Sequence, residues 1–549
     1  MRHRLPGARS IVFRRRQSSA SRLSLFKGNN LVLVHLSGIA AYAATLRLST
    51  PDLLLVALYL VAVTVFGLRF RSGDRSLKSY FLADQRIPWW AIALSIVAAE
   101  TSTLTIISVP GVAYTGDWGF LQIVFGYLLG RIVVCILFLP RYFRGELLTA
   151  YQVIGQRFGP RLHKLTAFLF LFLRAAAEGV RVFAVSIVVG IAIGTPDIAS
   201  IAIICALTLA YTLEGGMAAV IWTDVVQMIL YLVGTIAGVF TLGRLIPGGW
   251  HAIHATAAGA GKLTIFHFAF SLSTTYTFWA GLAGGCFLTM ASHGTDQLMV
   301  QRLLAARNLR ESRLALLSSG LVILVQFVLF LAIGTGLYFF YSNFATGSAA
   351  GNAASSADRI FPTFIVQQMP RGIAGLMVAA ILAAAMSNLS AAVNSLSSSS
   401  MVDLYLQWKP AAGERHRVIV SRVMTVFWAM LLFVLAWMSR GGGHVVEVGL
   451  SIASVAYGAL LGVFLLGTLS TDATEPGAII GMIGGFALNL FLWRHPRPIP
   501  FSLGGMHMVL PAIAWTWFVL VGSLFTFALG WIASKLLPGA RSYRSDDLR

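Results

Sequence analysis

The sequence predicts an all-α polytopic membrane protein that crosses the bilayer thirteen times. Of its 549 residues, 57% are hydrophobic and only 11% are charged, whereas about 25% of the residues in a typical soluble domain are charged. The mean hydropathy is +0.79. Basic residues outnumber acidic residues by 41 to 20, but they lie between apolar blocks. This pattern excludes a disordered chain and a soluble nucleic-acid-binding protein.

Thirteen apolar stretches are long enough to cross a bilayer, which requires about 20 helical residues. Backbone polar groups within lipid must be satisfied inside the segment, so we expect helices rather than strands. The longest breaks, 244–272 and 342–371, are expected to be loops, and neither could form a soluble catalytic domain. No arrangement of side chains indicates an enzyme. The expected spans are 52–70, 88–109, 118–140, 164–194, 197–213, 217–243, 273–293, 314–341, 372–400, 418–438, 446–468, 476–493 and 508–534.

The distribution of Lys and Arg orients these spans, because cytoplasmic loops carry an excess of basic residues. Every second loop, together with the C-terminal tail, holds 22 Lys and Arg in total, whereas the alternate loops hold seven. We therefore expect a multi-pass protein of the plasma (inner) membrane with a cytoplasmic C-terminus. The first span would then begin outside.

Residues 1–50 do not fit this orientation, since they hold nine basic residues and no acidic residue. Three interpretations remain open. The start codon could be assigned too far upstream, with the protein beginning near residues 46–51. A fourteenth span at 31–46 could bring the segment inside. The segment also resembles a transit peptide. We expect no chemistry from it.

Ionisable side chains within two of the spans indicate a polar site. Glu100 lies near the middle of the second span. Arg174, Glu178 and Arg181 share one face of the fourth span by their helical spacing. Charges in a membrane are costly unless they are paired, and they usually face a polar cavity. We expect Glu100 to neutralise this net-positive triad, in a solute-binding or proton-sensitive site. The alternative is a static ion-pair network that joins the helices.

Four segments carry specific strings of residues. Ser95–Gly111 is rich in hydroxyls and ends in Pro-Gly. Gly215–Gln227 contains Gly-Gly, Trp-Thr-Asp and Gln. Gly294–Arg302 contains Asp-Gln and Gln-Arg and is followed by Ala-Ala-Arg-Asn. Ser387–Ser400 places further hydroxyls within a span.

These strings resemble the signatures of the sodium:solute symporter family, which includes the sodium/glucose cotransporters. The resemblance covers about residues 51–540 and implies a secondary active symporter that imports a small polar organic solute with Na⁺ by alternating access. It implies inverted five-helix repeats, each beginning with a helix broken near its middle. The implied divisions are a basic extension (1–50), an accessory span and cytoplasmic loop (51–87), the first repeat (88–243), an external loop (244–272), the second repeat (273–468) and accessory spans with a cytoplasmic tail (469–549).

The resemblance also implies a sodium site made of oxygen ligands, which a hard cation prefers. The family usually has a Ser or Thr at the position of Asn388, so the amide of Asn388 alters the site. Alternatively, Ser387 and Asn388 only hydrogen-bond to a neighbouring helix. Asp224 would lie near the sodium exit route. Na⁺ is the expected coupling ion, and no other cofactor is expected. The implied sodium ligands are Ala98, Thr101, Ala384, Ser387 and Asn388.

The solute itself is not specified. Positions that contact sugar in the sodium/glucose branch fall at Thr105, Thr289 and Ser292, and none carries the side chain found there. Sugar specificity is therefore unsupported. The other candidates for solute or coupling groups are Glu100, Glu178 and Arg181. The expected partners are a small solute, Na⁺ and the lipid bilayer, without nucleic acid.

Two alternatives remain open. The same fold could couple transport to H⁺ through Glu100 or Glu178. A transport-derived membrane sensor belongs to another class, but only about 15 residues follow the last expected span. Sensors of that kind usually add a cytoplasmic signalling domain.

Overall fold

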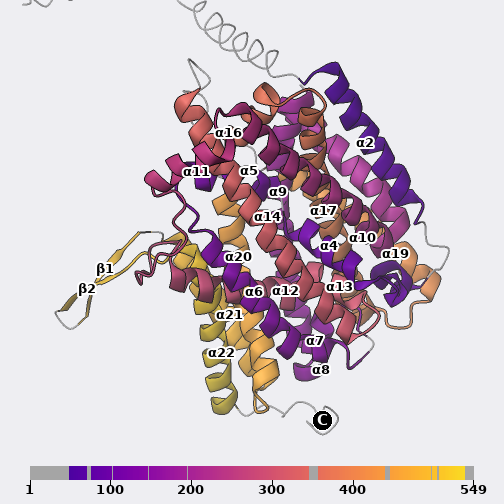
Figure 1. Cartoon of the computed structure of the whole chain (residues 1–549). Helices are drawn as coiled ribbons and strands as arrows, with labels where there is room; N and C mark the ends of the chain where they lie inside the picture. Colours follow the sequence, from indigo (N-terminus) through magenta and orange to yellow (C-terminus); the bar gives the residue numbers. More distant parts are fainter. Residues whose placement is uncertain are drawn as a thin grey trace, which may run out of the picture. The chain divides into compact units, whose positions relative to one another are not determined.

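The computed structural model describes residues 48–537 except 71–75, 102, 146, 194–195, 345–356, 439–444, 496 and 504–505. The predictions for 1–50 therefore lie almost entirely outside the described residues. Within these limits the chain is helical apart from one antiparallel hairpin, formed by β1 (Ile499–Leu503) and β2 (Met506–Leu510) (Figure 1).

Helical segments lie at all thirteen expected ranges. Seven of the described helices are long and apolar enough to cross a membrane, and a bent pair makes eight. The finer count of thirteen spans stays a prediction. The segments are α2 (Thr50–Leu68), α4 (Trp89–Glu100) with α5 (Thr103–Thr115), α6 (Leu121–Leu137), α9 (Pro160–Ile193), the two halves of α10 (Asp197–Leu245), α12 (Gly285–Gly294), α14 (Leu309–Asn343), α17 (Ile373–Ser399), α19 (Glu414–Met438), α20 (Val445–Leu469), α21 (Glu475–Arg494) and α22 (Phe518–Leu536).

The connecting elements are short helices. They are α3 (Leu77–Leu82), η1 (Ala83–Gln85), α7 (Leu139–Tyr142), α8 (Tyr151–Phe158), α11 (Gly249–Gly259), α13 (Gln297–Leu304), α16 (Ala357–Gln368), α18 (Leu406–Trp408) and η4 (Trp515–Trp517). Two π-helical turns, η2 (Ala280–Gly284) and η3 (Ser400–Tyr405), precede α12 and follow α17.

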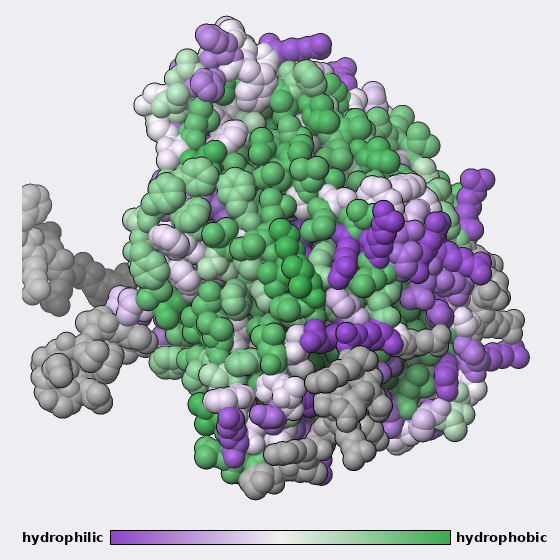
Figure 2. All heavy atoms as spheres, turned by 60° about the horizontal axis from the view of Figure 1, so that its bottom comes forward, coloured by the Kyte–Doolittle hydropathy of each residue, from purple (hydrophilic) through white to green (hydrophobic). Residues whose placement is uncertain are grey.

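The surface of this helical part is widely apolar, as a bilayer requires. Figure 2 shows broad hydrophobic areas on one face, with hydrophilic side chains gathered beside them. On α2, Leu54 is 66% exposed and Leu58 is 70% exposed. Because these residues are one helical turn apart, they form an apolar stripe that faces lipid.

The centre of the described helical part is α17, which is buried along almost its whole length. It packs against α2, α9, α10 and α19. Its many Ala and Ser side chains are small, so neighbouring helices approach it closely. This position brings polar groups of α17 next to those of α4 and α9.

Two helix breaks shape the surroundings of α17. The axes of α4 and α5 differ by 63°. The chain at Thr101, directly after α4, is extended (φ −81°, ψ 96°). The second break divides α10 at Gly216 (φ 52°, ψ −146°). A Cβ at Gly216 would lie 2.4 Å from the carbonyl oxygen of Tyr80, so this position requires glycine.

The expected break in span 273–293 is not found. Instead, the π-helical turn η2 continues directly into α12. Glycines there permit close packing against α6, since a Cβ at Gly281 would lie 2.7 Å from the backbone carbon of Gln122. A π-helical turn changes the direction of side chains without freeing a long stretch of backbone.

Three further expectations about span and loop limits were wrong. The expected loop 244–272 contains α11, in which Ile253 and Ala257 are buried one turn apart. The expected loop 342–371 contains α16. The start of the expected span 508–534 belongs to β2 and the residues after it, and α22 begins only at Phe518. A short apolar run does not by itself distinguish a strand from a helix.

Two carboxylates from outside the expected repeats cap helices within them. Asp52 of α2 accepts hydrogen bonds from the amides of Gly372 (2.6 Å) and Gly375 (2.9 Å) at the start of α17. Glu475 of α21 accepts hydrogen bonds from the amides of Arg161 (2.8 Å) and Leu162 (3.0 Å) at the start of α9. The first amides of a helix lack partners within it and attract negative charge. These contacts therefore fasten α2 and α21 to two central helices.

Candidate functional site

A cavity of about 230 Å³ lies beside the break between α4 and α5, with further walls from α6, α9, α12, α14 and α20. Five of the six residues that the sequence indicated for solute or coupling line it. They are Glu100, Thr105, Arg181, Thr289 and Ser292. The sixth, Glu178, lies directly behind Arg181.

One polar cluster of the cavity surrounds Glu100. Arg131 of α6 is fully buried and forms an ion pair with Glu100. His293 Nε2 lies 3.5 Å from Glu100 Oε2, and His293 Nδ1 lies 2.9 Å from the Ser292 hydroxyl. The prediction that Glu100 neutralises the triad of α9 was therefore wrong in the partner, because the long side chain of Arg131 reaches Glu100 from α6. Arg131 was visible in the sequence as a basic residue within a span.

The second polar cluster is formed by α9. Arg174 Nη2 and Arg181 Nη1 each donate to the same oxygen of Glu178, both at 3.2 Å. Arg174 Nη1 also donates to Asp296 Oδ2 at 3.3 Å. The Tyr457 hydroxyl donates to that oxygen at 2.6 Å. The shared face predicted for the triad is thus an ion-paired network, which Asp296 extends to α13.

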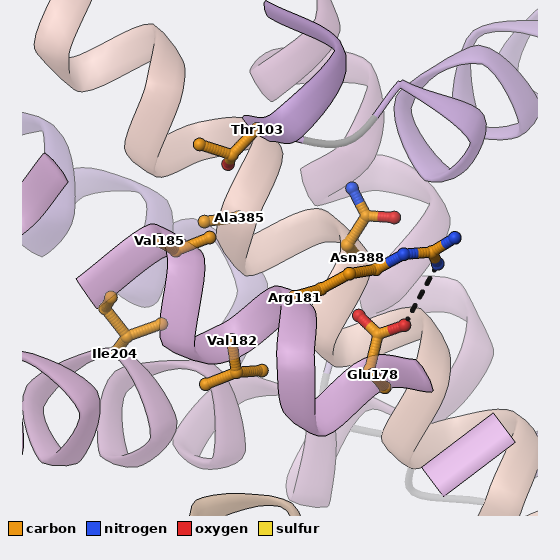
Figure 3. Close-up of a pocket in the computed structure, with 8 residues that line it drawn as sticks. All are labelled: Thr103, Glu178, Arg181, Val182, Val185, Ile204, Ala385 and Asn388. Carbon is orange, nitrogen blue, oxygen red and sulfur yellow. Dashed lines mark hydrogen bonds and ion pairs between the residues drawn. The ribbon is translucent and has the colours of Figure 1, made fainter. Parts of the chain in front are cut away.

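Arg181 connects this cluster with a second, small cavity. The lining of that cavity includes Thr103, Glu178, Arg181 and Asn388. Figure 3 shows Arg181 between its ion-pair partner Glu178 on the same helix and the amide of Asn388 on α17. Arg181 also lines the larger cavity. One side chain therefore borders both the solute candidates and a residue expected to bind sodium.

Some of the expected sodium ligands contact the side chain of Asn388. Its Nδ2 donates to the carbonyl oxygens of Thr101 (3.2 Å) and Ala384 (3.0 Å). Its Oδ1 is buried and has no hydrogen-bond partner. Ala98 lies in the last turn of α4, where carbonyls lack partners within the helix. The carbonyl oxygens of Thr101 and Ala384 are within reach of one amide, and oxygen ligands of this kind fit a small hard cation.

Ser387, the remaining expected ligand, donates its hydroxyl to Asp224 Oδ1 at 2.7 Å. A donating hydroxyl keeps lone pairs that can bind a cation. Asp224 is fully buried and also accepts from Ser95 at 2.5 Å and from Arg302 at 2.9 Å. The strings Trp-Thr-Asp and Gln-Arg therefore meet in one ion pair, next to the expected sodium ligands.

Aromatic side chains form much of the remaining cavity wall, and the sequence did not indicate that they belong to the site. Aromatic side chains are 12% of the chain, so their number offers no signal. The described lining residues of this kind are Phe120, Tyr127, Tyr276, Phe327, Tyr457 and Trp515.

Comparison with known proteins identifies relatives over most of the chain. A sequence profile of the sodium:solute symporter family matches residues 80–485. The sodium-dependent multivitamin transporter of Oryctolagus cuniculus is 28% identical over 457 residues, which are 82% of this chain and 71% of that protein. The sodium/sialic acid symporter SiaT of Proteus mirabilis (strain HI4320) is 26% identical over 498 residues, 89% of this chain and 96% of that protein. The sodium/iodide cotransporter of Homo sapiens is 28% identical over 501 residues, 89% of this chain and 76% of that protein.

Solved structures indicate the same fold. The substrate-bound outward-open state of a Na⁺-coupled sialic acid symporter superposes with a TM-score of 0.79 at 24% identity, covering 90% of this chain and all of that chain. A nucleobase-cation-symport-1 family transporter gives a TM-score of 0.53 at 12% identity, covering 87% of this chain and all of that chain. Because the family profile spans most of the sequence, the chain belongs to the sodium:solute symporter family.

Proposed function

We propose that this protein imports a small polar organic solute together with Na⁺ by alternating access. The observation that carries the proposal is the 230 Å³ cavity beside the broken α4–α5 helix, with oxygen donors of Thr101 and Ala384 at the break. Family membership supports Na⁺ as the coupling ion. The names of the relatives include vitamins, sialic acid and iodide, so the solute must be inferred from this chain's own cavity.

In this proposal the carbonyls of Ala98, Thr101 and Ala384, the Ser387 hydroxyl and the Asn388 amide oxygen hold Na⁺. The cation would join α4 to α17, because its ligands come from both helices. The polar residues of the large cavity would bind the solute on the other side of the α4–α5 break. Asp224, joined to Ser387 at 2.7 Å, would receive Na⁺ on its way out.

The proposed architecture keeps thirteen spans, with inverted repeats at 88–243 and 273–468. The α4–α5 bend at the start of the first repeat supports it, and so does the position of α17 at the centre of the bundle. The accessory segments 51–87 and 469–549 flank these repeats. The excess of basic residues in alternate loops supports a plasma (inner) membrane protein with a cytoplasmic C-terminus.

A proton-coupled version of the same transport is the second candidate, because Glu100 and His293 lie together at the cavity wall. Uptake by proteoliposomes distinguishes the two. We expect a panel of radiolabelled solutes to include one that accumulates under an inward Na⁺ gradient and not under an equal K⁺ gradient. Accumulation driven by a pH gradient without Na⁺ would favour H⁺ coupling and contradict the Na⁺ proposal.

A single hydroxyl tests the cation site. Ser387→Ala removes one proposed ligand, so we expect the Na⁺ concentration for half-maximal uptake to rise about tenfold, equivalent to about 1.4 kcal/mol. Ser523→Ala is the matched control, since Ser523 is also fully buried but its hydroxyl donates to its own helix, at Leu520 (3.1 Å). Equal Na⁺ dependence of both variants would place the cation elsewhere.

A further inference from the structure

We infer that the transported solute carries a carboxylate and that the guanidinium of Arg181 binds it. This inference rests on the proposed function and adds the chemical class of the solute. A guanidinium has five N–H donors in a planar arrangement that matches a carboxylate. Arg181 lines the large cavity, and its side chain keeps 18% of its surface exposed.

The ion pairing of Arg181 is incomplete. Its described partner is Glu178 Oε2, at 3.2 Å from Nη1, whereas a charge-assisted N–H···O bond is usually about 2.7–2.9 Å long. The same oxygen accepts from Arg174, also at 3.2 Å. One carboxylate oxygen is thus shared by two guanidinium groups. Arg181 retains unused donors at the cavity wall.

Two fully buried arginines of the described chain differ from Arg181 in this respect. Arg302 is fully buried and uses three nitrogens, on Ser95 (2.8 Å), on the Leu298 carbonyl (2.8 Å) and on Asp224 (2.9 Å). Arg131 is also fully buried and contacts Glu100, Ser319 and Tyr127. These two arginines join helices, and their donors are used in hydrogen bonds, whereas Arg181 is partly exposed to the cavity.

A second observation points to an anion at the same wall. Arg174 lines the large cavity beside Arg181, and its side chain is only 8% exposed. Its Nε is buried without a hydrogen-bond partner. Buried N–H groups almost always have a partner, because an unsatisfied donor costs about 1–3 kcal/mol. Arg174 therefore adds positive charge beside Arg181 on one side of the cavity, together with a donor that the described residues leave unsatisfied.

The charges around the cavity favour an anion over a neutral solute. The lining acids and their partners comprise Glu100, Glu178 and Asp296, and they match the charges of Arg131, Arg174 and Arg181 when His293 is neutral. The site is therefore close to neutral before any solute binds. A cation bound with a neutral solute would leave uncompensated positive charge inside the protein, which is costly. A carboxylate would compensate it.

The position of Arg181 couples the two binding events. It borders the small cavity that Asn388 also lines, and Na⁺ at the proposed site would raise the positive potential there. A carboxylate on Arg181 would lower that potential. Each ligand would thus favour binding of the other, which symport requires.

The remaining wall limits the body of the solute. Aromatic rings of Phe120, Tyr276, Phe327 and Trp515 line the cavity together with the hydroxyls of Thr289 and Ser292. Pockets for drug-sized ligands are usually about 300–1,000 Å³, so a cavity of about 230 Å³ fits a smaller molecule. We therefore expect a short-chain or single-ring monocarboxylate.

Matched pairs of acids and amides test the inference. Benzoate and benzamide, nicotinate and nicotinamide, and lactate and lactamide differ in the carboxylate and keep similar bodies. We expect at least one acid, and not its amide, to raise the melting temperature of the purified full-length protein in Na⁺. The same acid should accumulate in proteoliposomes under a Na⁺ gradient. No response to any acid, or an equal response to an acid and its amide, would overturn the inference.

Variants of the α9 cluster connect the effect to Arg181. Arg181→Gln should weaken the response to the acid at least tenfold, and Arg181→Lys should recover part of it by keeping the charge. Arg307→Gln is the control, because Arg307 is 57% exposed and its ion-pair partner among the described residues is Glu311, at 3.8 Å. If Arg181→Gln does not fold, Glu178→Gln provides the test. It removes the competing charge, so it should strengthen binding of the acid, and weaker or unchanged binding would contradict the inference.

The outcomes separate this inference from the proposed function. Na⁺-driven uptake of a neutral solute, with no effect of acids, would overturn the inference and leave Na⁺ symport intact. Uptake of an acid that does not depend on Na⁺ would support a carboxylate solute and overturn the proposed coupling to Na⁺. An acid response unchanged in both Arg181 variants would mean that another group binds the anion.

Discussion

Asn388 occupies the position where the expected sodium site departs most from its family. Its amide nitrogen donates to two of the carbonyls that would bind Na⁺. The amide must rotate to present Oδ1 to a cation, and this rotation breaks both hydrogen bonds. Each such bond contributes about 0.5–1.5 kcal/mol. At the proposed site, Asn388 would therefore compete with Na⁺ for these carbonyls.

Replacement of this amide by a hydroxyl should strengthen Na⁺ binding. We expect Asn388→Ser to lower the Na⁺ concentration for half-maximal uptake roughly tenfold, since about 1.4 kcal/mol corresponds to that factor. Asn489→Ser is a close control, because Asn489 also donates to two carbonyls (3.3 and 3.1 Å) and has a buried, unpaired Oδ1, but it lies on α21. A higher or unchanged Na⁺ requirement in Asn388→Ser would disprove the competition.

The pair of Arg131 and Glu100 should contribute to folding. Arg131→Gln leaves the largely buried carboxylate of Glu100 without its nearest partner, with His293 remaining at 3.5 Å. Removal of one partner of a buried ion pair typically costs about 3–5 kcal/mol. We expect a clearly lower melting temperature and less folded protein. The double variant Glu100→Gln with Arg131→Gln removes both charges and should recover much of the stability. Failure of the double variant to recover would indicate that Arg131 contributes through its contacts with Ser319 and Tyr127.

At the residue scale, the sequence indicates which side chains are polar within the membrane, but not which of them pair. The positions of Glu100, Thr105 and Arg181 within spans or motifs indicated polar surroundings. In the structure, all three residues line the cavity. The partner of Glu100 depends on how α6 packs, and no spacing along one helix reveals that. The partners Asp296 and Tyr457 come from distant parts of the chain for the same reason.

At the scale of elements, the two carboxylate caps can be tested separately from transport. Glu475→Gln keeps an acceptor but removes the charge at the start of α9, while Glu475→Ala removes both. We expect losses of stability that increase in this order, up to about 2 kcal/mol for alanine. Unfolding of the purified protein in denaturant measures this loss. Glu414→Ala is a suitable control, since among the described residues Glu414 accepts a single, longer bond, from Leu77 (3.3 Å).

The caps should not alter the cation site. Glu475 contacts the first turn of α9, whereas Arg181 lies about five turns further along the helix. The Na⁺ concentration for half-maximal uptake should therefore remain unchanged in Glu475→Gln. A large shift in this value would mean that the whole of α9 moves when its cap is lost.

Helix positions were predictable from hydropathy, and helix geometry was not. Apolar length located α14, α17 and α19 closely. The bend between α4 and α5 agrees with the resemblance and with a hydroxyl-rich centre. The π-helical turn before α12 was mistaken for a break, because glycines permit both structures. Contacts with α6 determine whether a break or a π-helical turn forms. These are tertiary contacts, which the sequence of one helix does not reveal.

At the scale of the whole molecule, the fold follows from few strong constraints. Lipid demands helices with satisfied backbones, and the family strings identify how they connect. The cavity chemistry is less predictable, because it depends on residues from α4, α9, α12 and α20 that meet only in the folded protein. The solute class is consequently inferred from the structure and not from the sequence.

The cap formed by Glu475 also has a consequence for biosynthesis. The amides of Arg161 and Leu162 precede Glu475 by 314 and 313 residues in the chain. A ribosome that has inserted α9 must therefore continue through most of the protein before this helix receives its acceptor. Asp52 differs, since it is made well before Gly372 and is ready when α17 emerges. Nascent chains stalled before residue 475 would therefore contain α9 without this cap, and chains stalled well after it would contain α9 with the cap. Only in the longer chains would the amides in the first turn of α9 be protected.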